Sequence, residues 1–259
     1  MLNIGKYVDL NSDVGESYGC YKLGLDELVM KHISSVNIAC GWHAGDPLVM
    51  EDTVNLARQH GLGIGAHPGY PDLIAFGRRN IDISPKEART YLIYQLGSLT
   101  AFAAAVECSV DHVKLHGAFY NMVSVNSTLA KEIAKAVYEV DKNLIVLALA
   151  GSELVNACRQ IGLKVAEEVF ADRAYNSDGT LVSRKLPGSM IHNKEEAAER
   201  AVKMALEGKV KAIDGKEIKL NANSICVHGD NPEAVAFVEL ISRKLKESGV
   251  EISSLKNFI

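Results

Sequence analysis

Residues 35–72 read SVNIACGWHAGDPLVMEDTVNLARQHGLGIGAHPGYPD. The apolar runs Ser35–Ala39 and Leu62–Ala66 have the length of buried strands, and a helix-length segment lies between them. Two strands connected by a helix are typical of a parallel sheet, because parallel neighbours need a long crossover. This stretch therefore predicts a βα unit in which polar residues follow each strand directly.

The same alternation of strand-like runs and helical patterns continues along the rest of the chain. Ser84-Pro85-Lys86-Glu87 has the residues of a capping box with proline at the first helical position, so a helix is expected to begin there. No linker rich in Pro, Gly or Ser interrupts the pattern, and 259 residues are a normal length for one α/β barrel. We therefore predict a single domain over residues 1–259, a seven-stranded parallel (β/α) barrel. The five further candidate strands are Lys6–Asn11, His112–His116, Leu144–Leu149, Lys164–Phe170 and Ser224–His228.

The segment between Asp172 and Asn223 is longer than a single crossover helix requires. Within it, apolar residues alternate on both sides of Asp214-Gly215, which predicts a β-hairpin over Lys209–Leu220, inserted before the last strand. The sequence leaves the role of this insert open. It is either a docking surface for a partner, or a lid over the barrel mouth or a contact in a homo-oligomer.

The composition excludes several classes of protein. The net charge is −4 with 23% charged residues, and no basic stripe or basic amphipathic helix suggests a nucleic acid or a membrane surface. No apolar run approaches the roughly 18 residues of a membrane span, and no signal-peptide pattern is present. The five cysteines are odd in number and lack CxxC pairs, which indicates a reducing compartment. A cytoplasmic protein is expected.

Polar clusters follow nearly every predicted strand. Because side chains alternate along a strand, Asp9 and Asn11 share one face of their strand, and Lys114 and His116 share one face of theirs. With the apolar faces packed on helices, these polar faces point into the barrel, where a lysine is costly unless it is paired or functional. α/β barrels build active sites at the carboxyl ends of their strands, so one shared site is predicted there. Four of the eight histidines occupy such positions: His43, His67, His116 and His228.

Several motifs with known chemistry are absent. The sequence contains no GxxxxGK[ST], HExxH or GxSxG, so any use of ATP cannot rest on a P-loop. Cys40-x-x-His43 supplies two of the four ligands that a structural zinc needs, and no tightly bound structural metal is expected. Whether a divalent ion sits in the barrel stays open.

Taken together, the polar clusters resemble the LamB/YcsF family. The six blocks that carry the resemblance are, in chain order, DLNSDVGE, NIACGWHAGD, GAHPGYPD, KLHGAFYN, EVFADRAY and SICVHGDNP, and they extend from Asp9 to Pro232. The resemblance implies a barrel related to the glycoside hydrolase/deacetylase fold. It also implies the A component of a three-part 5-oxoprolinase, an enzyme that opens 5-oxoproline to L-glutamate with ATP hydrolysis. Two further subunits, and ATP carrying Mg²⁺, follow from the same resemblance.

Residue type and position at the strand ends suggest roles. Lysine and arginine can balance phosphoryl charge, histidine can move protons near neutral pH, and carboxylates can orient a histidine or hold magnesium. The candidate catalytic residues are Asp13, His43, His67, Lys114, His116 and His228. The candidates for binding substrate or nucleotide are Asp9, Asn11, Glu16, Asp46, Arg78, Asp172, Arg173 and Asp230.

Two other functions remain open on the sequence. One is a metal-dependent deacetylase or amidohydrolase acting on a small amide or sugar, since strand-end Asp and His can ligate a divalent ion. The other is a noncatalytic subunit that binds a substrate or a partner. Dependence on MgATP would favour the oxoproline reaction over the metal-dependent one.

Overall fold

The computed structural model describes residues 6–228 and 232–259. Seven parallel strands form a closed barrel, because β1 pairs with β2 on one side and with β9 on the other. The strands are β1 (Lys6–Val14), β2 (Ser35–Ala39), β3 (Gly63–His67), β4 (His112–Val113), β5 (Ile145–Leu149), β6 (Val165–Phe170) and β9 (Ser224–Val227). The predicted seven-stranded parallel barrel is confirmed.

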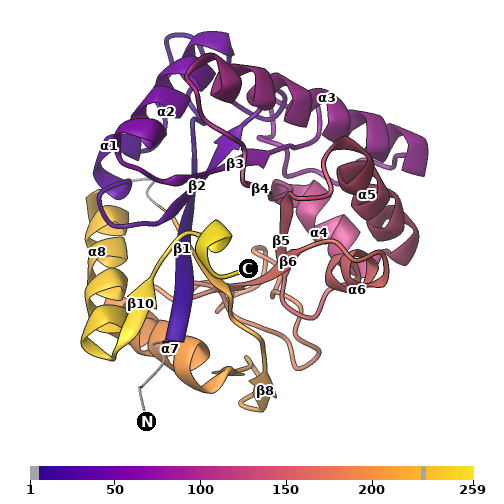
Figure 1. Cartoon of the computed structure of the whole chain (residues 1–259). Helices are drawn as coiled ribbons and strands as arrows, with labels where there is room; N and C mark the ends of the chain where they lie inside the picture. The colour runs from indigo at the N-terminus through magenta and orange to yellow at the C-terminus, as the bar shows by residue number, and fades with distance from the viewer. Residues whose placement is uncertain (1–5, 229–231) are drawn as a thin grey trace.

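Helices surround this barrel, and Figure 1 shows them as an outer ring around the strands. They are α1 (Asp26–Val29), α2 (Pro47–Gln59), α3 (Pro85–Ala105), α4 (Gly117–Val125), α5 (Ser127–Val140), α6 (Glu153–Gln160), α7 (Lys194–Glu207) and α8 (Pro232–Glu247). The main core lies between helices and strands, where α3 buries Leu92, Leu96 and Leu99 completely. Among the helices of the described residues, none has the length and hydrophobicity needed to cross a bilayer.

The capping box predicted at Ser84 is present at the start of α3. The Ser84 hydroxyl accepts from the Glu87 backbone N–H, and the Glu87 carboxylate accepts from the Ser84 backbone N–H. Two backbone donors that the first helical turn leaves without partners are thereby satisfied.

The fourth strand is shorter than predicted, since it ends at Val113 instead of His116. The chain still follows β3, because the backbone N–H groups of Lys114 and His116 donate to Ala66 and Pro68. It then turns sharply into α4 at Gly117, which has a φ of 56°. A Cβ on this glycine would lie 2.7 Å from the Gly77 carbonyl oxygen, so the turn requires glycine.

The predicted hairpin is confirmed as the antiparallel pair β7 (Lys209–Lys211) and β8 (Glu217–Lys219). The sequence patterns did not predict the C-terminal segment, in which β10 (Val250–Ile252) pairs with β1 and a turn of 3-10 helix, η1 (Leu255–Asn257), follows. Leu255 packs with Ile145 and Leu147 of β5 in a small cluster separate from the main core. Figure 1 shows the C-terminus over the centre of the barrel, so this segment fills one end of the lumen.

Candidate functional site

The inward face of β1 carries three polar side chains in alternate positions. The deepest, Asp9, accepts hydrogen bonds from the hydroxyls of Ser34, Ser35 and Ser224. Complete burial raises the pKa of Asp9 to about 6, although these three hydrogen bonds oppose the rise. Asp9 therefore belongs to the floor of the lumen and does not line the pocket described below.

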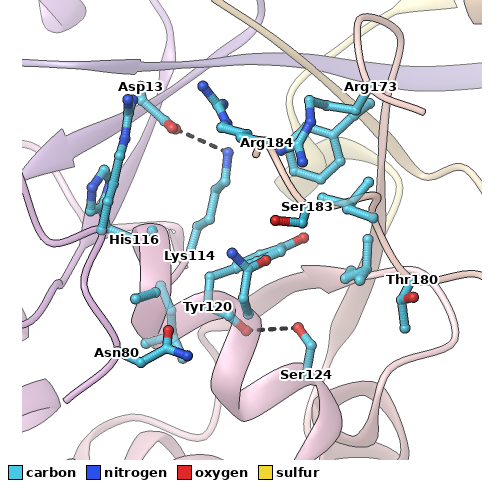
Figure 2. A pocket seen from close by; sticks show the side chains of 18 of the residues that line it. Asp13, Asn80, Lys114, His116, Tyr120, Ser124, Arg173, Thr180, Ser183 and Arg184 are labelled. Carbon is cyan, nitrogen blue, oxygen red and sulfur yellow. Dashed lines mark hydrogen bonds and ion pairs between the residues drawn. The ribbon is translucent and has the colours of Figure 1, made fainter. Parts of the chain in front are cut away.

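Lys114 lies at the centre of the lumen. Its ammonium contacts Asp13 Oδ1 at 3.0 Å and Glu168 Oε1 at 2.8 Å, and it donates to Asn11 Oδ1 at 3.2 Å. Burial alone would lower the pKa of Lys114, but the facing carboxylates, Asp13 first, raise it well above its ordinary value. Lys114 is therefore a fixed, buried cation at neutral pH, and Figure 2 shows its ion pair with Asp13.

Two members of this network were missed by sequence reasoning. Glu168 of β6 is fully buried and accepts from Asn11 Nδ2 at 3.0 Å and from the Tyr120 hydroxyl at 2.7 Å. Burial and this carboxylate raise the pKa of Tyr120 well above 10. A signal for Glu168 existed in the sequence, because an acid in the middle of an apolar strand must be paired once it is buried.

Three histidines meet beside Asp13. The rings of His43 and His116 are stacked with centroids 3.6 Å apart, and His67 Nε2 lies 2.9 Å from His116 Nδ1. His67 Nε2 is also 3.3 Å from Asp13 Oδ2. Burial, and then the neighbouring histidines, lower the pKa of both His43 and His116 well below the usual value. Both rings are therefore neutral at physiological pH.

His228 forms a separate pair with Asp172. Its Nδ1 lies 2.8 Å from Asp172 Oδ2. Burial would raise the pKa of Asp172, but the His228 ring lowers it below the ordinary value, so the carboxylate is ionised. A carboxylate only accepts, so the proton lies on Nδ1, and in the neutral form of the ring Nε2 is then the nitrogen that can take a proton, the arrangement of an oriented general base.

A pocket of about 830 Å³ opens above these groups. Five of the predicted catalytic residues line it, namely Asp13, His67, Lys114, His116 and His228, together with Glu16, Arg78 and Arg173 from the predicted binding set. Figure 2 shows the His116 ring on one side of this pocket and Arg173 on the other. Arg184, which the sequence patterns did not single out, lies near Arg173. The insert therefore contributes to the pocket through residues 180–185.

Other predicted residues lie elsewhere. The His43 ring is stacked on the His116 ring, and Asn11 Oδ1 accepts a hydrogen bond from the Lys114 ammonium. Both residues belong to the network and do not line the pocket. Asp46 caps α2, where its Oδ1 accepts from the backbone N–H groups of Leu48 and Val49. Asp172 lines a smaller neighbouring pocket, and Asp230 is outside the described residues.

Potential metal ligands also assemble here. Glu16, His43, His67 and His116 each offer one ligand atom, and these atoms all lie within 4.8 Å of one another. The expectation of no tightly bound metal rested on the lack of four ligands close together in the sequence. The structure removes that reason, because the ends of four different strands and the loops that follow them bring four ligands to one point.

Comparison with known proteins gives a consistent picture. The model of the LamB/YcsF family matches residues 8–259. A protein from Fusobacterium nucleatum that is named as the A component of 5-oxoprolinase is 54% identical over 253 residues, which are 98% of each chain. Proteins of the same name from Campylobacter jejuni and Pyrococcus furiosus are 55% and 54% identical over 97% of this chain and 99% of theirs.

Solved structures agree on the fold. The crystal structure of a lactam utilization protein from Thermus thermophilus superposes with a TM-score of 0.91 at 42% identity and covers 96% of this chain and 100% of that one. A putative cellobiose-phosphate cleavage protein from Enterococcus faecalis has a TM-score of 0.62 at 12% identity, covering 98% of both chains, and shares the barrel alone.

Proposed function

This chain belongs to the LamB/YcsF family, and on that basis we propose that it is the A component of an ATP-dependent 5-oxoprolinase, which opens 5-oxo-L-proline to L-glutamate. The observation that carries the proposal is the near-complete alignment, at 54–55% identity, with relatives that bear the name of this component. The pocket supports it, because its size and its cations suit a small anionic substrate.

The reaction needs activation because a lactam is resonance-stabilised. Attack of the ring carbonyl oxygen on the γ-phosphorus of ATP forms a phosphorylated lactam and releases ADP. Water then adds to the ring carbon, the carbon–nitrogen bond breaks as the nitrogen gains a proton, and an acyl phosphate results. A second water hydrolyses it to glutamate and phosphate. The site must therefore hold an anion, balance phosphoryl charge and move protons.

We propose that Arg173 and Arg184 bind an anionic group, either the substrate carboxylate or the phosphoryl group. Arg173 is 7% exposed, and its Nε has no hydrogen-bond partner among the described residues, while another guanidinium nitrogen donates to the Val182 carbonyl. A buried donor without a partner carries a cost that an incoming carboxylate or phosphoryl oxygen would remove. Arg184 beside it would hold the same group.

We assign proton transfer to His228 and charge balance to Lys114. The Asp172 carboxylate holds His228 in the tautomer that can take a proton from water and return it to the leaving nitrogen. The Lys114 ammonium, at the pocket floor, would balance the negative charge of the phosphoryl group that is transferred to the lactam oxygen.

The proposal includes two partner subunits that supply the nucleotide site, because the sequence has no P-loop. The hairpin β7–β8 does not line either pocket, so we assign it to docking and the residues 180–185 to covering the pocket. Replacing the hairpin by a short turn should weaken assembly with the partners more than it unfolds the barrel. Normal assembly of that variant would remove the docking assignment alone.

The test is reconstitution. The chain is assayed by itself and with its two partner subunits for release of glutamate and ADP from 5-oxoproline and ATP. We expect activity only in the complete mixture, with equal amounts of glutamate and ADP, and loss of glutamate formation with Asp172→Asn. Full turnover by the chain alone, or glutamate formation without ATP, would contradict the proposal.

A further inference from the structure

We propose that Glu16, His43, His67 and His116 form a binding site for one divalent transition-metal ion of the zinc class. The spacing of the ligand atoms fits such an ion. Glu16 Oε1 lies 3.2 Å from His43 Nε2 and 3.6 Å from His116 Nδ1, and His116 Nδ1 lies 2.9 Å from His67 Nε2. Tetrahedral ligands about 2.1 Å from a zinc ion are about 3.4 Å apart, close to these values.

Backbone carbonyls fix the protonation of two of the three imidazoles. His67 Nδ1 lies 2.8 Å from the Lys114 carbonyl oxygen, and His116 Nε2 lies 2.8 Å from the Phe76 carbonyl oxygen. A carbonyl oxygen only accepts, so each of these outer nitrogens carries a proton. Metal-binding histidines are oriented in this way, with the outer N–H held by a carbonyl or a carboxylate.

The inner nitrogens, His67 Nε2 and His116 Nδ1, face each other at 2.9 Å. With the outer nitrogens protonated, two acceptor nitrogens at this distance need a cation, either a proton or a metal ion, between or beside them. One metal ion would take both lone pairs and the Glu16 carboxylate at once. His43 would complete the set by turning out of its stack with His116, because two parallel rings 3.6 Å apart cannot both direct an in-plane lone pair at one ion.

The donor set selects the type of ion. Three imidazole nitrogens and one carboxylate suit Zn²⁺ or Co²⁺, whereas Mg²⁺ and Ca²⁺ prefer oxygen ligands. The structure offers a second group, Asp13, Cys226 and His228, but the Lys114 ammonium contacts Asp13 at 3.0 Å and Cys226 Sγ at 3.2 Å and already occupies that position. A bound ion beside the pocket would supply a Lewis acid for a carbonyl or a water.

Metal binding to the full chain tests the inference without 5-oxoproline or ATP. Protein dialysed against a chelator is titrated with Zn²⁺ by calorimetry and with Co²⁺ by visible absorption, which reports tetrahedral coordination. We expect one equivalent to bind in the presence of millimolar Mg²⁺. His67→Ala and Glu16→Gln should each raise the Kd at least tenfold, whereas His60→Ala, at an exposed histidine that follows the C-terminal end of α2, should bind like the wild type.

Each outcome bears on the inference. If His67→Ala unfolds, as a thermal melt by circular dichroism would reveal, Glu16→Gln still provides the test because Glu16 lies at the pocket edge with 13% of its side chain exposed. Absence of binding, or equal binding by the wild type and Glu16→Gln, would overturn the site. In that case a proton shared between His67 Nε2 and His116 Nδ1, and not a metal ion, accounts for their close approach. Failure here leaves the proposed 5-oxoprolinase reaction standing, because no step of it was assigned to the ion.

Discussion

Lys114 contacts three strands of the barrel, β1, β6 and β9, through one ammonium group. Its ammonium contacts the carboxylates of Asp13 on β1 and Glu168 on β6, so the positive charge is buried together with the negative charges that it balances. Attraction inside the barrel offsets the loss of hydration only while the set is complete. The role proposed for Lys114 in the reaction and its contribution to stability are therefore different, and substitutions can separate them.

We predict that Lys114→Met destabilises the barrel by about 3–5 kcal/mol, because the buried Glu168 carboxylate loses its counter-charge. Adding Glu168→Gln should recover more than half of that loss, since the neutral amide needs no cation. Glutamate formation by the reconstituted complex should stay absent in both variants. Urea denaturation and the coupled assay measure the two effects, and a double variant that regains activity would exclude a direct role for Lys114.

Asp9 gives a prediction for the pH dependence of stability. Its pKa in the folded protein is about 6, above the usual 3.8, so the folded state holds a proton that the unfolded state has released between these values. Stability from this group is therefore complete below pH 3.8 and falls as pH rises toward 6, by about 3 kcal/mol in total.

Asp9→Asn removes this titration. The free energy of unfolding of the variant, relative to the wild type, should increase as pH rises from 4 to 6 and then level off. Urea denaturation at pH 4, 5, 6 and 7 measures the difference. Parallel curves for the two proteins would show that Asp9 titrates normally in the folded state.

At the scale of elements, the loops after the strands carry the site, and the helices that follow hold those loops in place. The loop after β3 supplies Arg78 to the pocket and ends at the capping box of α3. The turn at Gly117 brings the start of α4 against Gly77 of the same loop. Fixed helix starts therefore position side chains that come from irregular backbone.

We predict that Ser84→Ala lowers the free energy of unfolding by about 1 kcal/mol, because the Glu87 backbone N–H loses its acceptor. Activity of the complex should change little, since Ser84 does not line the pocket. Ser84→Asp is the matched control and should retain most of the stability, because aspartate is also a good N-cap. Thermal melts of the three proteins measure the order, and equal melting temperatures would contradict the cap's contribution.

The whole molecule is a barrel with two different ends. The pocket opens at the end where the strands finish, while the C-terminal segment fills the opposite end with Leu255 against Ile145 and Leu147. Lys256 ties the segment to Asp111, in the loop before β4, at 3.0 Å. We therefore expect that stability can be altered at one end without a change in the chemistry at the other.

We predict that Leu255→Ala, a change at a side chain that is 1% exposed, costs about 2–5 kcal/mol of stability by opening a cavity. The kcat of the reconstituted complex at 25 °C should stay within about twofold of the wild type while the variant remains folded, a change of under ~0.5 kcal/mol in the barrier. A large fall in kcat without a fall in melting temperature would show that this end of the barrel reaches the site. Exposed Lys135→Ala on α5 serves as a control for surface truncation.

The seven barrel strands, their inward parity and most of the polar residues in the lumen could be predicted from the sequence because these features are local. Alternation along β1 places Asp9, Asn11 and Asp13 on one face whatever lies opposite, and Ser84 to Glu87 form a cap from four adjacent residues. The placement of Lys114 on the polar face follows from the same period of two.

Only the tertiary structure decided which of these groups meet. Glu168 pairs with Lys114 across 54 residues of chain, and Leu255 closes a barrel end more than 100 residues after β5. The four ligand atoms of Glu16, His43, His67 and His116 converge from the ends of four different strands or the loops that follow them, which no spacing in the sequence records. Closure of the barrel determines which side chains contact one another in the lumen. These contacts depend on the register between strands and not on the order of residues along any one strand.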